Sequence, residues 1–364
     1  MTWYEKLDFT EDPYTKKDPL LIPFEKMEWD RPDLASAKTK LDKFLKDVLG
    51  NYRVSLKLFG PHGCGKTWTL RLIEKLVKSQ VKNPLIIDTK IPYLEAKFSR
   101  LYSLFIMGLE RTGGLDKIIE AINKNTGSTV NQWANFLRDR DLAQCLHNIK
   151  HGSQEQLSKG WLYGEALSLS DLKSAHIYVR LDSDYTMFKI MQILLEKSSL
   201  TFDTVVLSID EMENADVSLA RGLSDALRDL LDSFSEKFVM VCAYTAHRED
   251  DWIDFGYSEA LVRRLDYTIE LGQLQKDALV EFIRTHNSLY RKGKSKVEDQ
   301  LYPFKEEGLY RLYDSMEIGY LYPGYFLPNC GVLARIAVEK DSEVDAKLVN
   351  ESFSHLRWLK GSQS

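Results

Sequence analysis

Apolar positions along this chain follow two alternating patterns, one typical of helices and the other of buried strands. Apolar residues three and four positions apart predict helices at 34–49 and 67–79. Short apolar runs, typical of strands covered on both faces of a sheet, occur at 55–59, 85–87, 204–209, 238–243 and 267–271. Because strands and helices alternate, we expect an α/β fold with a doubly wound parallel sheet.

Two long blocks depart from this alternation and predict how the chain is divided. Residues 92–200 hold several helical patterns and little strand signal, so we expect a helical insertion within an α/β core of residues 34–272. Residues 273–364 are expected to form a C-terminal helical domain, and residues 1–33, rich in aromatic residues and prolines, an extended N-terminal arm. The helices of the C-terminal domain are expected at 277–290, 304–314, 332–339 and 344–359.

Composition and charge limit the partners and the compartment. The 364 residues carry a formal net charge of −5, with 44% hydrophobic and 28% charged residues. That balance excludes a disordered chain, and a net acidic protein can contact nucleic acid only through local basic patches. No apolar run approaches the roughly 20 residues that a membrane span requires. The cysteines lie far apart, so we expect a cytoplasmic protein with reduced thiols and no membrane contact.

A glycine-rich segment after the first predicted strand matches the phosphate-binding pattern G-x-x-x-x-G-K-[ST] in full. Glycines in this pattern let backbone N–H groups surround phosphates at the positive end of the following helix. Lys66 is expected to reach the β- and γ-phosphates, and the Thr67 hydroxyl to hold Mg²⁺. The alternative, a chance match in a turn, is disfavoured by the flanking strand and helix. The candidate nucleotide-binding residues are Gly60, Pro61, His62, Gly63, Cys64, Gly65, Lys66, Thr67 and Trp68.

The predicted strand at 204–209 leads directly into two carboxylates, Asp210 and Glu211. The carboxyl ends of parallel strands face the ligand in such sheets, so we expect both side chains at the nucleotide. Asp210 would hold Mg²⁺ together with Thr67, and Glu211 would orient or deprotonate the attacking water. The alternative is an ordinary acidic helix start, since Asp and Glu favour helix N-termini. The phosphate loop upstream favours the catalytic interpretation.

These motifs, in this order, resemble those of AAA+ ATPases. Three later segments continue the resemblance: the strand at 238–243 followed by Tyr244-Thr245, the segment 261–266, and the segment 331–335. The resemblance covers the chain from about residue 34 onward, apart from the insertion. It implies a P-loop ATPase with a C-terminal helical lid at 273–364, and ATP with Mg²⁺ bound between core and lid.

The resemblance also implies roles for four further residues. Thr245 matches the first sensor, which contacts the γ-phosphate, or is a plain strand-end threonine. Arg264, in an Arg-x-Asp arrangement, is favoured over Arg263 as the arginine finger that completes a neighbouring subunit's site; an intramolecular ion pair is the alternative. Arg335 matches the second sensor of the lid, or forms a salt bridge between lid and core.

Within the superfamily the chain is similar to the branch of origin-recognition-type initiators, transposition-regulator ATPases and phage-exclusion ATPases. The shared features are Asp210-Glu211-x-Glu213, the opening Lys6-Leu7-x-Phe9 with Asp12-Pro13, and Trp161-Leu162-x-Gly164. This likeness implies an oligomerising nucleotide switch in DNA transactions of a mobile element, of replication or of phage defence. The alternative is a regulatory NTPase coupled to a protein partner without DNA.

Partners are expected from the same resemblance and from charge. An arginine finger acting between subunits implies a homo-oligomer, and a regulatory ATPase of this kind implies a protein partner. DNA contact would use local basic patches, of which 291–296 is the most basic stretch; a solvated loop is the alternative. Only 29 residues follow Arg335, so we expect no winged-helix domain after the lid.

Overall fold

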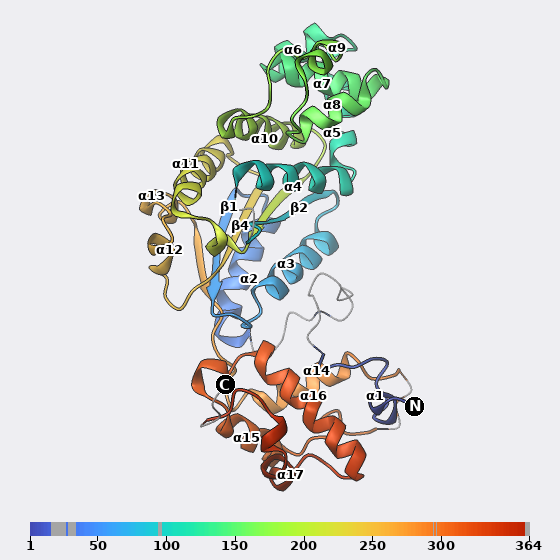
Figure 1. The fold of residues 1–364 in the computed structure, drawn as a ribbon, viewed down its shortest axis with the longest axis vertical. Coiled ribbons are helices and arrows are strands. Elements are labelled where there is room, and N and C mark those ends of the chain that lie inside the picture. Colours follow the sequence, from blue (N-terminus) through green and yellow to red (C-terminus); the bar gives the residue numbers. More distant parts are fainter. Residues whose placement is uncertain (16–26, 28–33, 94–96, 294, 296, 361–364) are drawn as a thin grey trace. The chain divides into compact units, whose positions relative to one another are not determined.

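The computed structural model describes residues 1–15, 27, 34–93, 97–293, 295 and 297–360 (Figure 1). The chain divides into two compact units. The sheet-containing unit comprises residues 43–59 and 73–269, and the lid-containing unit comprises 1–42, 60–72 and 270–364. Each unit has its own cluster of buried apolar side chains.

A five-stranded sheet forms the centre of the α/β core within the described residues. The spatial order β2-β3-β4-β1-β5 places β3 and β1 on either side of β4. β2 pairs in parallel with β3 from Pro84 opposite Thr204 to Lys90 opposite Asp210, and β3 pairs in parallel with β4. The strands are β1 Val54–Gly60, β2 Pro84–Lys90, β3 Thr204–Asp210, β4 Phe238–Thr245 and β5 Tyr267–Glu270. The predicted parallel α/β fold is confirmed.

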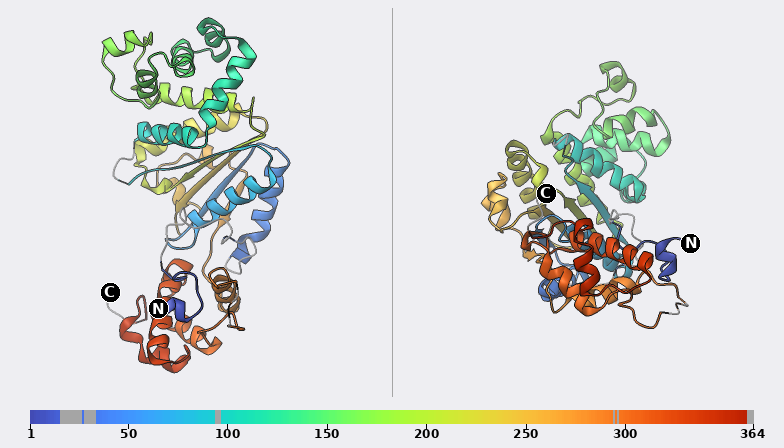
Figure 2. Two further views of the ribbon diagram at one scale, coloured as in Figure 1. Left: turned by 90° about the vertical axis from the view of Figure 1, so that its right-hand side faces the viewer. Right: turned by 60° about the horizontal axis from the view of Figure 1, so that its bottom comes forward.

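Helices cover both faces of this sheet (Figure 2). One face carries α2 (Ala35–Leu49) and α3 (Lys66–Gln80), as their apolar spacing predicts. The other face carries α4 (Phe98–Arg111) and α11 (Val217–Ser233), and α10 (Asp184–Ser198) packs against both helices. Gly108 lets α4 approach β2 closely, because a Cβ at this position would lie 2.9 Å from Cγ2 of Ile87. Three short helices follow β3 in this unit: η4 Met212–Asn214, α12 Asp251–Asp254 and α13 Glu259–Val262. The long helix among them is α11, Val217–Ser233.

Helices fill the described part of the chain between β2 and β3. Trp133 and Trp161 are buried there, and their indole N–H groups donate to the carbonyls of Gly127 (2.7 Å) and Val179 (2.8 Å). Both indoles belong to the same buried apolar cluster as the strand residues, so the insertion and the sheet share one core. The helices are α4 Phe98–Arg111, α5 Gly114–Thr126, α6 Val130–Leu137, α7 Arg140–His151, α8 Glu155–Leu162, α9 Leu169–Ser174 and α10 Asp184–Ser198.

The C-terminal helices differ from the expected ones at two places. The helix expected at 332–339 begins nine residues earlier, at Pro323, and ends at Lys340. The helix expected at 344–359 is α17, Ala346–Glu351, followed by a short 3₁₀ turn. It ends early because the Asn329 side chain pairs with the backbone of Arg357, accepting from its N–H at 3.0 Å and donating to its carbonyl at 2.9 Å. The other elements are α14 Leu279–Ser288, α15 Glu306–Ser315, η5 Ile318–Tyr320 and η6 Phe353–His355.

The N-terminal arm is not wholly extended. A four-residue helix, α1 (Trp3–Lys6), is closed by a capping box between Thr2 and Glu5, the T-x-x-E pattern of helix starts. Phe9 and Tyr14 are buried among the lid helices, and the Tyr14 hydroxyl donates to Oδ1 of Asn287 at 2.5 Å. Residues 16–26 and 28–33 of the expected arm lie outside the described residues.

Arg291 contacts both the N-terminal arm and the C-terminal helical domain. Its guanidinium is therefore not available to a DNA backbone. Its guanidinium donates to the carbonyls of Leu7 and Tyr302 and lies over the ring of Phe9, 4.2 Å from the centroid. The residue is buried, because these contacts enclose it. Of the basic stretch 291–296, Lys292 is exposed, and Lys294 and Lys296 lie outside the described residues. Among the described helices, none has the length and apolar character needed to span a membrane.

Candidate nucleotide-binding site

The phosphate-loop motif forms the turn between β1 and α3, with Gly60 at the end of the strand and Lys66 at the start of the helix. Gly63 and Gly65 have φ angles of 81° and 103°, a region that L-residues with a Cβ avoid. A Cβ added to Gly65 would meet no atom within 4 Å, so open space lies over the loop there. The backbone therefore has the conformation and the room that phosphate binding requires.

Lys66 is buried, and its side chain is hydrogen-bonded to the backbone of the phosphate loop. Its ammonium group donates to the carbonyls of Gly60 at 2.9 Å and Pro61 at 3.1 Å. One turn on, the Thr69 hydroxyl donates to the carbonyl of Gly65 at 3.1 Å. A cation and the N-terminus of a 15-residue helix thus meet at one turn, which favours a bound anion. Thr67 and Trp68 follow in the first turn of α3, Cys64 is buried, and His62 is exposed.

The start of α16 lies against this loop within the same unit. The Gly324 N–H donates to the carbonyl of Gly63 at 3.0 Å, and a Cβ on Gly63 would lie 3.0 Å from Cε2 of Tyr325. The Tyr325 ring is tilted toward His62, with ring centroids 6.2 Å apart. Burial raises the pKa of the Tyr325 hydroxyl, so it stays a neutral phenol beside the loop.

Arg335, the residue matched to the second sensor, lies three turns further along the same helix. At 1.5 Å per residue it is about 16 Å along the axis from Gly324. It is exposed, and the structure does not bring it to the phosphate loop. The first turn of α16 occupies the place next to the loop instead.

Asp210 and Glu211 stand at the end of β3. Asp210 is 9% exposed, and its Oδ1 accepts from the Glu211 N–H at 2.8 Å. Glu211 has a φ of 56°, a left-handed conformation that is uncommon for a residue with a long side chain. This turn directly follows Asp210, the last residue of the strand. Backbone strain of this kind is typical of functional sites.

Asn214 connects Glu211 with the first residue after β2. Its Nδ2 donates to the carbonyl of Ile91 at 2.8 Å and to Oε2 of Glu211 at 3.4 Å. The Ile91 N–H in turn donates to the carbonyl of Asp210 at 3.0 Å. Ile91, just before the helical insertion, is therefore bonded directly to Asp210 and is linked to Glu211 through Asn214. The sequence analysis did not identify Asn214, since an Asn in a turn after a strand has no distinctive pattern.

Thr245 ends β4, next to the acidic turn. Its backbone N–H donates to Oε2 of Glu213 at 2.9 Å, which ties the end of β4 to the turn after β3. Glu213, the third acid of the motif, thus has a structural contact. The Thr245 side chain is half-buried at the strand end.

The two candidate finger residues are engaged in ion pairs within the sheet-containing unit. Arg264 pairs with Asp232, Nη1 to Oδ1, at 2.8 Å, and Arg263 pairs with Glu259 at 2.5 Å. All four side chains are exposed, so each pair contributes about 0–1 kcal/mol and opens readily.

In the strand order, β4 lies between β1 and β3. The phosphate loop follows one strand and the acidic pair ends the other. A phosphate loop and an acidic strand end on a sheet of this order define a P-loop nucleotide-binding protein.

Sequence and structure comparisons place this protein more narrowly. A family model described as an AAA domain matches residues 50–249, and the chain belongs to this family. No curated protein matches the sequence. The resemblance to AAA+ ATPases is confirmed by this family match.

Three solved structures share the fold at low identity. The ADP form of the Aeropyrum pernix ORC2 protein has a TM-score of 0.54 at 9% identity, covering 95% of this chain and 73% of that chain. Its ADPNP–ADP complexes have a TM-score of 0.50 at 9% identity, covering 90% and 68%. Cdc6p from Pyrobaculum aerophilum has a TM-score of 0.54 at 13% identity, covering 98% and 73%.

Proposed function

We propose that this protein is a cytoplasmic ATPase that works as an oligomerising nucleotide switch. The observation that carries the proposal is the phosphate loop itself, with its left-handed glycines and the buried Lys66 ammonium on the loop carbonyls. Membership of the AAA domain family and the acidic end of β3 support it. The ORC2 protein, which has this fold, was solved with ADPNP and ADP, and that supports an adenine nucleotide as the ligand.

The residues at the loop fit a triphosphate. Open space over Gly65 admits phosphate oxygens, and Lys66 would exchange its loop carbonyls for those oxygens, keeping its charge compensated. The loop residues from Gly60 to Trp68 would surround the phosphates. Thr67 and Asp210 offer the hydroxyl and carboxylate oxygens that Mg²⁺ prefers. Bound Mg²⁺ would supply charge neutralisation on the phosphates.

We assign to Glu211 the orientation or deprotonation of the attacking water. Its carboxylate would accept a proton from, or orient, the water that attacks the γ-phosphorus, while Lys66 stabilises charge on the phosphate oxygens. Asn214 would hold Glu211 through its 3.4 Å contact, and Thr245 would contact the γ-phosphate from the end of β4. Arg264 of one subunit, released from Asp232, would complete the site of the next, with Arg263 as the alternative.

The target of the switch is the finer part of the proposal. We propose action in DNA transactions, in which Lys292 would be an exposed phosphate contact. The second candidate is a protein-coupled regulatory ATPase without DNA. The burial of Arg291, which removes one cation from the basic stretch, favours this second candidate.

One set of measurements tests these assignments. The purified chain is titrated with a fluorescent ATP analogue, and phosphate release and solution mass are measured with and without ATP-Mg and duplex DNA. Saturable binding, turnover and an ATP-dependent rise in mass are expected. Absence of nucleotide binding would overturn the ATPase proposal. If DNA binds, Lys292→Ala should reduce the slope of log K against log salt by about 0.9; no DNA binding at low salt would leave the protein-coupled function.

A further inference from the structure

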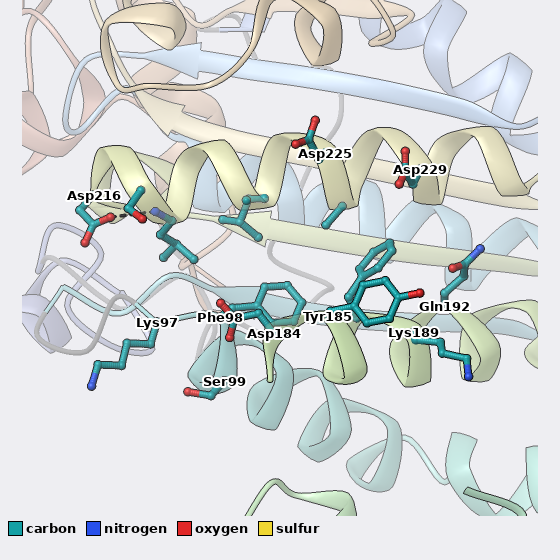
Figure 3. Close-up of a pocket in the computed structure, with 16 residues that line it drawn as sticks. Lys97, Phe98, Ser99, Asp184, Tyr185, Lys189, Gln192, Asp216, Asp225 and Asp229 are labelled. Atoms are coloured by element: carbon teal, nitrogen blue, oxygen red, sulfur yellow. Dashed lines mark hydrogen bonds between the residues drawn. The ribbon is translucent and has the colours of Figure 1, made fainter. Parts of the chain in front are cut away.

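A groove runs between α10 and α11 (Figure 3). Its volume is about 660 Å³. The lining comes from the start of α4, from α10 between Asp184 and Gln192, and from α11 between Asp216 and Asp229. All three segments belong to the sheet-containing unit.

Small residues on α11 keep the groove open. Gly222 and Ala226 lie one turn apart on the lining face, and a Cβ added to Gly222 would meet no atom within 4 Å. Glycine inside a helix is less favourable than alanine, so local helix stability does not explain this residue. Among the described residues, no side chain fills the space over Gly222.

The groove presents apolar side chains from both walls. Tyr185 and Phe188 line it from α10, three positions apart, and Leu219 lines it from α11, whereas the lining residue Leu223 is fully buried. Tyr185 is 78% exposed, which is unusual for a large aromatic side chain on a folded protein. Exposed apolar side chains in such a groove offer a surface on which the apolar face of an amphipathic helix can pack.

Acidic residues dominate the polar part of the lining. Lys189 pairs with Asp139 outside the groove at 3.1 Å. Asp225 and Asp229 share one cation, Arg228, at 3.3 Å and 3.2 Å, so two carboxylates face a single guanidinium. The lining aspartates are Asp184, Asp216, Asp225 and Asp229, and the lining lysines are Lys97 and Lys189. The groove therefore keeps a negative charge, which attracts cationic side chains and repels phosphates.

We propose that this groove binds an amphipathic helix rich in lysine and arginine on a protein partner. Apolar side chains of that helix fill the space over Gly222 and pack on Tyr185, while its cations pair with the aspartates along α11. The charge of the groove disfavours DNA as the occupant. The inference specifies the partner of the proposed switch, but the binding itself does not require ATP turnover.

The groove ends next to the catalytic turn. Asp216 lines it and also caps α11, accepting from the Leu219 N–H at 2.8 Å. The turn with Glu211 and Asn214 directly precedes Asp216 in the chain. A helix bound at this end adds contacts to the start of α11, so nucleotide turnover is expected to change when the groove is filled.

The test uses the full chain without nucleotide and a labelled peptide of about 14 residues with leucines at i, i+3, i+4 and i+7 and lysines elsewhere. Binding is followed by fluorescence anisotropy at two salt concentrations. Gly222→Leu fills the groove and also improves the helix, so its thermal midpoint should not fall. Asp225→Lys with Asp229→Lys reverses the wall charge. Glu236→Lys is the single-charge control on an exposed residue outside the groove, and an all-glutamate version of the peptide is the second control.

Binding to the parent that weakens with salt, and that Gly222→Leu and the double variant each reduce at least about tenfold, supports the inference. The glutamate peptide should not bind, and Glu236→Lys should bind like the parent. Equal binding by Gly222→Leu and the parent overturns the inference, because the peptide then sits elsewhere on the acidic surface. No binding to the parent also overturns it. Since nucleotide is absent, neither result depends on whether the ATPase proposal holds.

Discussion

Gly324, in the first turn of α16, donates its N–H to the carbonyl of Gly63 in the phosphate loop at 3.0 Å. A Cβ on Gly324 would lie 2.9 Å from Cα of Gly63, so the two backbones are in direct contact. A change in the shape of the loop backbone must therefore move the start of α16, or break this hydrogen bond.

Gly324→Ala is expected to weaken the contact between the first turn of α16 and the phosphate loop. The added methyl cannot fit at 2.9 Å, and overpacking of this kind costs about 1–3 kcal/mol. We expect a labelled ADP to dissociate up to about tenfold faster, as measured by stopped-flow chase. Gly319→Ala, where a Cβ meets no atom within 4 Å, is the matched control. Equal dissociation rates in both variants would mean that the contact has no bearing on nucleotide release.

Lys66 and Glu211 should separate binding from turnover. Lys66→Ala removes the cation at the loop and should abolish ATP binding. Glu211→Gln keeps the shape of the side chain but cannot take a proton, so ATP should bind with turnover reduced by at least about a hundredfold. Nucleotide titration and phosphate release measure the two effects. Loss of ATP binding in Glu211→Gln would show that the assignment of Glu211 to the attacking water is wrong.

Asn214→Ala tests whether the link to Glu211 positions the carboxylate. Loss of this donor should lower kcat about three- to tenfold and leave KM unchanged, because one hydrogen bond contributes about 1 kcal/mol. Asn214→Asp has nearly the same shape but repels Glu211, so it should turn over more slowly than the alanine variant. Steady-state kinetics of both variants provide the measurement, with thermal unfolding as a check on folding. Turnover equal to that of the parent in both would leave Asn214 a purely structural residue.

The Arg264→Ala variant should lack ATPase activity by itself. Mixing it with a second variant should restore part of that activity. The ion pair with Asp232 is exposed and weak, so its loss should change the free energy of unfolding by less than about 1 kcal/mol. Mixed with Lys66→Ala, which retains its arginine, Arg264→Ala should regain part of its activity, since some interfaces then contain one intact site. Arg263→Ala is the neighbouring control. Normal activity of Arg264→Ala at every protein concentration would transfer the role to Arg263 or remove it.

Arg291→Met should destabilise the lid-containing unit. The carbonyls of Leu7 and Tyr302 would lose their shared donor in a buried setting, which is expected to cost about 2–4 kcal/mol. Urea unfolding and the rate of proteolysis within the N-terminal arm measure the loss. Lys292→Met, which removes the adjacent exposed cation, should stay within about 0.5 kcal/mol of the parent. A similar small effect for both variants would contradict the anchoring role of Arg291.

The strands were predictable because each has a strong local pattern. Residues 204–209 are apolar or small without interruption, and the structure buries all seven residues of β3. The phosphate loop was predictable for a different reason, since its glycines and Lys66 stand at fixed spacing between a strand and a helix. In both places the local sequence and the tertiary structure favour the same conformation.

The lid helices were harder because long-range contacts decide them. Pro323 and Pro328 are typical of a break, so the sequence predicted a helix only from residue 332. Proline is favourable in the first turn, and burial of Phe326, Asn329 and Cys330 stabilises the helix through the second proline. Asn329, from that helix, then holds the backbone of Arg357 and excludes the helix expected there.

The helical insertion leaves the carboxyl end of β2 and returns at the amino end of β3, two strands paired over seven residues each. A pull between the two ends of the insertion therefore acts along the strands. Their hydrogen bonds resist it together, as a shear, and do not open one after another. The Ile91 N–H, bonded to the carbonyl of Asp210, lies at the end of β2, where a pull on the insertion would first act on the sheet. Tension on the insertion would therefore reach Asp210, the residue before Glu211, through a mechanically stiff pair of strands.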